Sequence, residues 1–108
     1  MSRSLPTSAS VVVIGGGAMG SSTLYHLAAL GFDQPVLLER DQLTSGTSWH
    51  SAAQVRALRS TENLTRLIQY SAALYQRLEA ETGQSTGWNQ TGSLSIATHA
   101  DRLTHIKR

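Results

Sequence analysis

The chain has 108 residues, no cysteine, and a formal net charge of +2 from nine basic and seven acidic residues. Disulfide bonds and thiol chemistry are therefore excluded, and the dispersed basic residues form no patch of the kind that binds nucleic acid or an anionic membrane. The apolar runs are too short to span a bilayer. The composition predicts a soluble chain of one small domain's size, in which residues 1–9, MSRSLPTSA, form a disordered leader.

The first predicted elements are two strands joined by a helix. The β-branched run VVVI predicts a buried parallel strand over residues 10–14, and GGGAMG follows directly. Apolar residues at helical spacing then occupy residues 21–30 before Gly31, and a second strand is expected over residues 35–39. Together these elements predict an α/β fold with a Rossmann-like βαβ unit that binds a dinucleotide.

The glycine-rich segment fits the pattern G-x-G-x-x-G. We expect Gly15 to allow a tight turn, Gly17 to let a diphosphate approach the backbone, and Gly20 to let helix and strand pack closely. Ala18 and Met19 would open the helix, where unsatisfied N–H groups and the helix dipole favour phosphate. Taken alone, the motif also fits a glycine-rich turn in an unrelated α/β domain.

An acidic residue ends the second predicted strand. Glu39 follows Gly20 by about 20 residues, the separation at which such units place a carboxylate that binds a ribose hydroxyl. Arg40 is expected to assist in holding the adenosine. A 2′-phosphate would be repelled by Glu39, so NADP is disfavoured, whereas NAD and FAD remain open because both use this half-site.

The second half of the chain predicts mainly scaffold. Residues 62–82 form an amphipathic helical pattern that Gly83 ends, with Tyr75 on its apolar stripe. Residues 87–97 alternate around Thr91-Gly92 and predict a β-hairpin or two short strands. Thr98 and Asp101 have the spacing of a capping box before a last helical stripe. The histidines outside residue 50 have no metal-ligand spacing, so no metal is expected. Arg56 and Arg59 suit either an anionic group or plain solvation.

From residue 38 to residue 97 the chain resembles the dimethylglycine dehydrogenase and sarcosine dehydrogenase group of FAD-dependent amine oxidoreductases, within the wider D-amino-acid-oxidase-like family. The resemblance is carried by LLERDQLTSGTSWH (37–50), ENLTRLIQYSAALYQRLEAETG (62–83) and TGWNQTGSLSIA (86–97). It implies FAD as the cofactor. It also implies oxidation of N-methylated glycine derivatives by hydride transfer to the flavin, with tetrahydrofolate as a possible acceptor of the one-carbon unit in a C-terminal part.

In that group the histidine of the S/T-W-H segment is the covalent flavin attachment site, which corresponds to His50. The resemblance implies that the surrounding small residues approach the cofactor: Gly46, Thr47, Ser48, Ala52 and Ala53. The family segment usually reads W-H-A-A-G, whereas this chain has Ala53 in place of the glycine. An added methyl group would weaken attachment if that position needs a positive φ. Because one member of the group is a noncatalytic regulatory subunit, a regulatory or interaction role is the alternative.

The predicted sheet has only two parallel strands, and the last helical stripe stops at residue 108. We therefore expect residues 10–108 to be the N-terminal portion of a larger FAD-binding domain, incomplete at its C-terminal end and inactive alone. The remainder of the chain or a second copy would cover its apolar surfaces. No catalytic residue is identified within the 108 residues. The expected location is the cytoplasm, or the mitochondrial matrix in a eukaryote.

Overall fold

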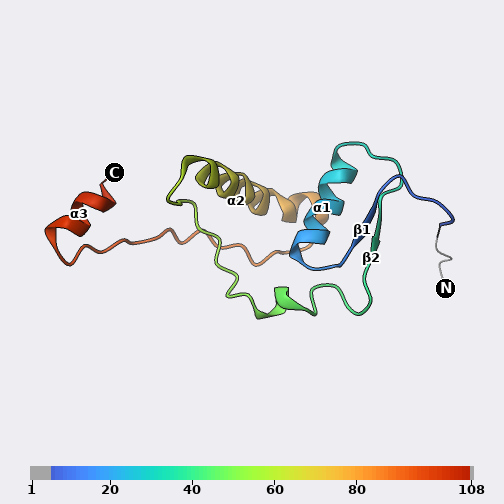
Figure 1. The fold of residues 1–108 in the computed structure, drawn as a ribbon, viewed down its shortest axis with the longest axis horizontal. Helices are drawn as coiled ribbons and strands as arrows, with labels where there is room; N and C mark the ends of the chain where they lie inside the picture. The colour runs from blue at the N-terminus through green and yellow to red at the C-terminus, as the bar shows by residue number, and fades with distance from the viewer. Residues whose placement is uncertain (1–5, 108) are drawn as a thin grey trace. The chain divides into compact units, whose positions relative to one another are not determined.

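The computed structural model describes residues 6–107. In chain order its elements are β1 (Val12–Ile14), α1 (Ala18–Ala29), β2 (Val36–Leu38), the 3-10 helix η1 (Thr47–His50), α2 (Glu62–Thr82) and α3 (Ala100–Ile106) (Figure 1). They divide between two compact units, Met1–Ala53 and Gln54–Arg108, each of which is described by itself. Of the predicted leader, residues 1–5 lie outside the described part, and residues 6–9 form no helix or strand.

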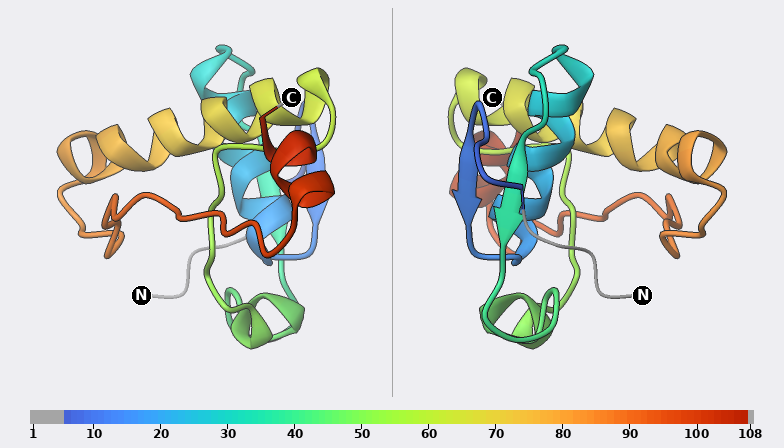
Figure 2. Two further views of the ribbon diagram at one scale, coloured as in Figure 1. Left: turned by 90° about the vertical axis from the view of Figure 1, so that its left-hand side faces the viewer. Right: turned by 90° about the vertical axis from the view of Figure 1, so that its right-hand side faces the viewer.

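The first unit contains the predicted strand, helix and strand. β1 and β2 pair in parallel, with Val12 opposite Val36 and Ile14 opposite Leu38. Both strands are shorter than predicted, with three residues each. The Gly15 N–H donates to the carbonyl of Leu38 at 2.8 Å, so the pairing continues one residue beyond β1. α1 contacts both strands, and both views of Figure 2 show it against one face of the pair.

α1 begins at Ala18, as the prediction for Ala18 and Met19 requires, and the chain reverses at Gly31. Gly31 has a φ of 82°, and its N–H donates to the carbonyl of Ala28 at 3.0 Å. The Phe32 N–H donates to the carbonyl of Leu27 at 3.1 Å. These two bonds form a Schellman motif, which satisfies carbonyls that the end of a helix otherwise leaves open. The turn brings the chain back to pair β2 with β1.

The second unit is organised by α2, whose bounds match the prediction. The Thr61 side chain accepts a hydrogen bond from the Leu64 N–H, and Gly83 ends the helix with a φ of 71°. The predicted apolar stripe is only partly covered, since Ile68 is half-buried whereas Leu67 is 61% exposed. The burial of apolar surface in this unit therefore stabilises it less than complete burial of the stripe would.

The predicted β-hairpin over residues 87–97 is wrong, because the described structure has no strand in this segment. The Trp88 ring stacks on the Tyr75 ring of α2, with 5.5 Å between centroids and 7° between planes. The Gln76 amide donates to the Gln90 side chain at 2.6 Å. Trp88 and Gln90 thus contact α2, whereas Leu94 and Ile96 further along the segment are 86% and 71% exposed.

The predicted capping box at the start of α3 is displaced by one residue. His99, and not Thr98, is the N-cap, and its Nδ1 accepts a hydrogen bond from the Arg102 N–H at 3.3 Å. Asp101 lies in the first turn, where a negative charge favours the helix dipole. An imidazole nitrogen replaces the expected hydroxyl as the capping acceptor. Within residues 6–107, no helix combines the length and the apolar character that a membrane span requires.

Candidate functional site

A pocket of about 710 Å³ lies in the first unit, where β1 and β2 end and α1 begins. Ligands of parallel α/β sheets bind at this place, beyond the carboxyl ends of the strands. Most of the predicted site residues meet there. The lining contains Gly15, Gly17, Ala18, Met19, Gly20, Glu39, Arg40, Gly46, Thr47 and Ser48.

The glycine-rich loop is closely packed at two of the three glycines of the predicted motif, Gly17 and Gly20. Gly15 has a φ of 104°, which suits the expected tight turn. A Cβ at Gly20 would lie 1.8 Å from the Gly15 carbonyl oxygen, and a Cβ at Gly17 would lie 3.1 Å from Ser48 Oγ. Bare backbone is therefore packed against backbone at Gly20 and against a hydroxyl at Gly17.

Glu39 binds the same loop through its carboxylate. Its Oε2 accepts a hydrogen bond from the Gly16 N–H at 2.6 Å, and its Oε1 accepts one from the Asp41 N–H at 3.0 Å. The Gly16 N–H is the main cause that lowers the pKa of Glu39 below its ordinary value, and the Asp41 N–H adds to it. The carboxylate is thus ionised at neutral pH. Its remaining lone pairs can accept hydrogen bonds from hydroxyl groups in the pocket.

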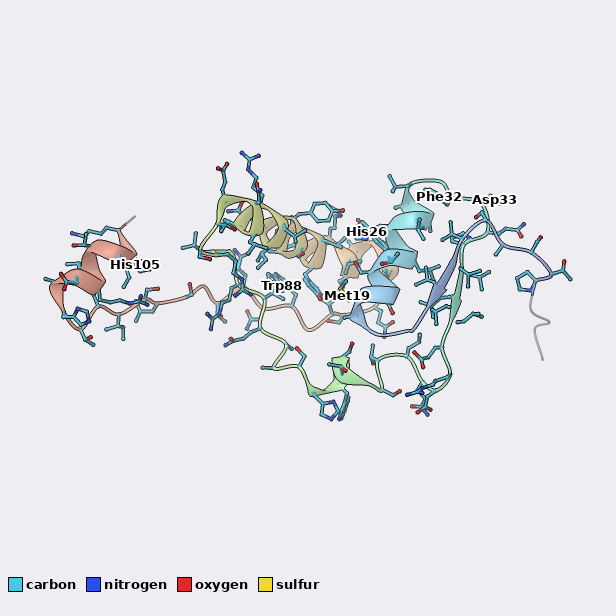
Figure 3. The ribbon with its side chains drawn as sticks, in the orientation of Figure 1. Met19, His26, Phe32, Asp33, Trp88 and His105 are labelled. Carbon is cyan, nitrogen blue, oxygen red and sulfur yellow. The ribbon has the colours of Figure 1, made fainter. Side chains whose placement is uncertain are left out.

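The N-terminus of α1 forms another part of the wall. Ala18 was expected to offer its N–H to a phosphate, but in this structure that N–H donates to Ser48 Oγ at 2.8 Å. Met19 is 84% exposed on the first turn of the helix (Figure 3). The first turn of a helix has N–H groups without carbonyl partners within the helix, and its dipole favours negative charge. This wall therefore suits an anion.

The loop that carries His50 forms a tight 3-10 turn after Gly46. The Gly46 carbonyl accepts a hydrogen bond from the Trp49 N–H at 3.2 Å. The same carbonyl oxygen lies 3.2 Å from His50 Nδ1. Because a carbonyl oxygen only accepts, Nδ1 must carry the proton in this contact, which leaves the lone pair of a neutral imidazole on Nε2. His50 is exposed and does not line the pocket; it lies two residues after Ser48 and one before Ser51, both of which line it.

Ala52 and Ala53 are also absent from the pocket lining. Ala53 has a φ of 52°, in the left-handed region that costs a residue with a Cβ roughly 1–2 kcal/mol. Its N–H donates to Ser51 Oγ at 3.1 Å, which holds the turn in place. The position at which the family resemblance expects glycine thus has the backbone conformation that favours glycine.

Sequence reasoning missed four polar residues of the lining: Asp41, Thr44, Ser45 and Ser51. The Thr44 N–H donates to the Gly16 carbonyl at 2.9 Å, so the segment between β2 and η1 folds back onto the glycine-rich loop. The only signal in the sequence is their position in the segment that follows Glu39 and contains His50, a segment rich in small polar residues.

A smaller pocket, of about 230 Å³, lies in the second unit. Arg56 and Arg59 line it together with residues of α2 that include Ser71 and Tyr75. Thr65 Oγ1 holds the Arg59 backbone by accepting from its N–H at 3.0 Å. Two guanidinium groups in one small pocket suit a carboxylate. In the part of the chain that the structure describes, no three His, Asp or Glu side chains are grouped to hold a metal.

Comparison with known proteins adds to this geometry. A model of the FAD dependent oxidoreductase family (DAO) matches residues 10–108. The chain is 51% identical over 108 residues to human mitochondrial sarcosine dehydrogenase, covering 99% of this chain and 12% of that protein. It is 43% identical over 99 residues to rat mitochondrial dimethylglycine dehydrogenase, with coverage of 92% and 12%. It is also 42% identical over 107 residues to the mouse mitochondrial pyruvate dehydrogenase phosphatase regulatory subunit, with coverage of 99% and 12%. The chain thus spans about 12% of the length of these relatives.

Proposed function

The chain belongs to the FAD-dependent oxidoreductase family, and from this premise we propose that its first unit holds the adenosine and diphosphate of FAD and presents His50 for covalent attachment. One observation carries the proposal. The glycine-rich loop, Glu39 and the segment from Gly46 to Ser48 line one pocket. A dinucleotide needs all three features: bare backbone, a ribose acceptor and a second wall.

The residues of the pocket fit the groups of the cofactor one by one. The ionised carboxylate of Glu39 would accept hydrogen bonds from the ribose hydroxyls, with Arg40 beside the adenosine. The N-terminal turn of α1 and the glycine-rich loop would hold the diphosphate. The Ser48 and Thr47 hydroxyls line the same pocket, with Ser48 Oγ bound to the Ala18 N–H at the start of α1. The pocket would thus offer a carboxylate to the ribose, and hydroxyls and helix N–H groups to the diphosphate.

Covalent attachment requires a neutral imidazole nitrogen with a free lone pair, and the Nδ1 contact with Gly46 leaves that lone pair on Nε2. Bound FAD would supply the carbon for this bond at its 8α methyl group and the acceptor for the two electrons that the exchange of C–H for N–C releases, and water would take the proton. The protein's own part is to orient His50 through the Nδ1 contact with the Gly46 carbonyl.

We propose that the complete protein oxidises N-methylated glycine derivatives, dimethylglycine or sarcosine. The bound flavin supplies a hydride acceptor for the substrate methyl group, after which the iminium product is hydrolysed or captured by tetrahydrofolate. The likeness to sarcosine and dimethylglycine dehydrogenases supports this substrate class. The pocket that Arg56 and Arg59 line would suit the substrate carboxylate. The mitochondrial relatives favour the matrix in a eukaryote, and the cytoplasm is the proposed location otherwise.

Two observations favour a second candidate, a noncatalytic regulatory or interaction subunit with the same fold. Ala53 occupies a backbone position that favours glycine, next to the attachment turn. One relative is named as a regulatory subunit of a phosphatase. In this case the fold would remain while flavin attachment is lost.

Anaerobic spectroscopy of the full-length protein separates the two candidates. We expect the purified protein to be yellow, and sarcosine or dimethylglycine to bleach its visible flavin absorption. Glycine, which has no N-methyl group, is the matched control and should leave the spectrum unchanged. A colourless protein that takes up no FAD would overturn the enzyme proposal and favour the regulatory role.

A further inference from the structure

We propose that Ser48 is a positioning residue that couples the diphosphate site to the placement of His50. This inference rests on the proposed function, because it concerns how the same pocket prepares flavin attachment. Ser48 is half-buried on the first turn of η1, whereas His50 at the end of η1 is exposed.

The segment that leads to η1 is fixed to the glycine-rich loop at several points. Ser48 Oγ accepts from the Ala18 N–H at 2.8 Å and lies 3.1 Å from the place of a Cβ on Gly17. The Thr44 N–H donates to the Gly16 carbonyl at 2.9 Å. Of these contacts, the one that the Ser48 hydroxyl makes is the closest to His50 along the sequence.

Within η1 the position of Ser48 determines that of His50. The Ser51 N–H donates to the Ser48 carbonyl at 3.2 Å, so a backbone hydrogen bond joins the residues before and after His50. His50 Nδ1 also contacts the Gly46 carbonyl at 3.2 Å. Because η1 is a single turn of four residues, a displacement of Ser48 displaces the imidazole as well.

The chemistry of a hydroxyl group allows Ser48 to bind the helix and the cofactor together. A hydroxyl has one proton to donate and two lone pairs to accept with. Ser48 uses a lone pair for the Ala18 N–H, and its proton is directed by rotation toward an acceptor in the pocket that it lines. A diphosphate oxygen is such an acceptor. Ser48 would then bridge α1 and the diphosphate, so the bound dinucleotide would add a second hydrogen bond to the one that already holds η1 to α1.

The test compares two side chains of the same shape in the full-length protein, Ser48→Thr and Ser48→Val, because only threonine keeps the hydroxyl. The measurement is the rate at which acid-stable flavin forms after FAD is added to apoprotein, together with total bound FAD. We expect Ser48→Val to slow attachment about tenfold relative to Ser48→Thr, the effect of one hydrogen bond to a charged group. Thr104→Val, the same chemical change on the exposed face of α3, should leave the rate unchanged.

Equal attachment rates in the threonine and valine variants would overturn the role of Ser48 while leaving the proposed function intact. Wild-type protein that forms no acid-stable flavin would instead contradict the attachment at His50, and the inference with it. If the valine variant loses total FAD binding and the bound fraction attaches at the wild-type rate, Ser48 is only a ligand of the cofactor and the coupling is wrong.

Discussion

The backbone of Gly20 lies directly against that of Gly15, since a Cβ at Gly20 would be 1.8 Å from the Gly15 carbonyl oxygen. No side-chain rotation relieves a contact of this kind, because both partners are fixed by the helix and the turn. The absence of a side chain at Gly20 allows α1 to approach the turn after β1 this closely.

We therefore expect Gly20→Ala to lower the free energy of unfolding by about 1–3 kcal/mol, the usual range for overpacking. The gain of roughly 1 kcal/mol in helix propensity offsets only part of this loss. Urea denaturation of the full-length protein measures the change. Ser22→Ala, at an exposed position of the same helix, is the control and should change stability by less than about 0.5 kcal/mol. An unchanged midpoint for Gly20→Ala would show that the loop relaxes without cost.

The elements with local signals could be predicted from the sequence. The glycine-rich loop, the bounds of α2 and the turn at Gly31 follow from residues that act on their immediate neighbours. The β-hairpin could not be excluded from the sequence, because alternation shows that a strand is possible and not that a second strand pairs with it. In the structure Trp88 stacks on Tyr75 of α2, whereas Leu94 and Ile96 are exposed.

The residues of the site likewise divide into those with a local signal in the sequence and those placed by contacts between distant segments. Gly15 to Gly20 and Glu39 could be predicted because spacing along one βαβ unit carries the signal. The bond between Ala18 and Ser48 could not, since it joins segments 30 residues apart and uses a side chain that resembles its polar neighbours in type. The place of His50 beyond the pocket lining likewise depends on how η1 turns.

Ala53→Gly should stabilise the protein, which is unusual for a substitution to glycine. The left-handed φ of 52° costs alanine about 1–2 kcal/mol, whereas glycine loses about 0.4–1 kcal/mol through the entropy of the unfolded chain. The expected net gain is about 0.5–1 kcal/mol in urea denaturation. Ala52→Gly is the control, because Ala52 has no positive φ and its substitution should destabilise. A loss of stability in both variants would contradict the strain at Ala53.

Glu39 should give the protein a stabilising contribution that is lost in acid. Its pKa in the folded state is below the ordinary value of about 4.5, since the Gly16 and Asp41 N–H groups favour the carboxylate. The contribution is therefore complete above about pH 4.5 and disappears as the pH falls through the lowered pKa. The amide shift of Gly16, followed by NMR, should titrate below pH 4.5. Glu39→Gln should abolish this titration of the Gly16 amide shift, whereas the control Glu62→Gln should leave it unchanged. A titration that persists in Glu39→Gln would contradict the contact.

Arg56 and Arg59 should act on substrate binding rather than on flavin binding. Replacing each by glutamine removes a charged partner for the substrate carboxylate, which is worth about 1.5–3 kcal/mol, so we expect KM for sarcosine to rise roughly tenfold or more. The flavin content should not change. Arg66→Gln, which breaks only an exposed ion pair with Glu62, is the control and should leave KM unchanged. An unchanged KM in the variants at residues 56 and 59 would show that these arginines only interact with solvent.

The central claim is that the imidazole of His50 bonds to the flavin. The full-length protein is produced in the presence of FAD, denatured in acid and separated on a gel. Flavin fluorescence is then measured in the polypeptide band. Wild type and His105→Ala, which changes an exposed histidine of α3, should both fluoresce, and His50→Ala should not. Fluorescence that persists in His50→Ala, or a wild-type band without flavin, would contradict the account.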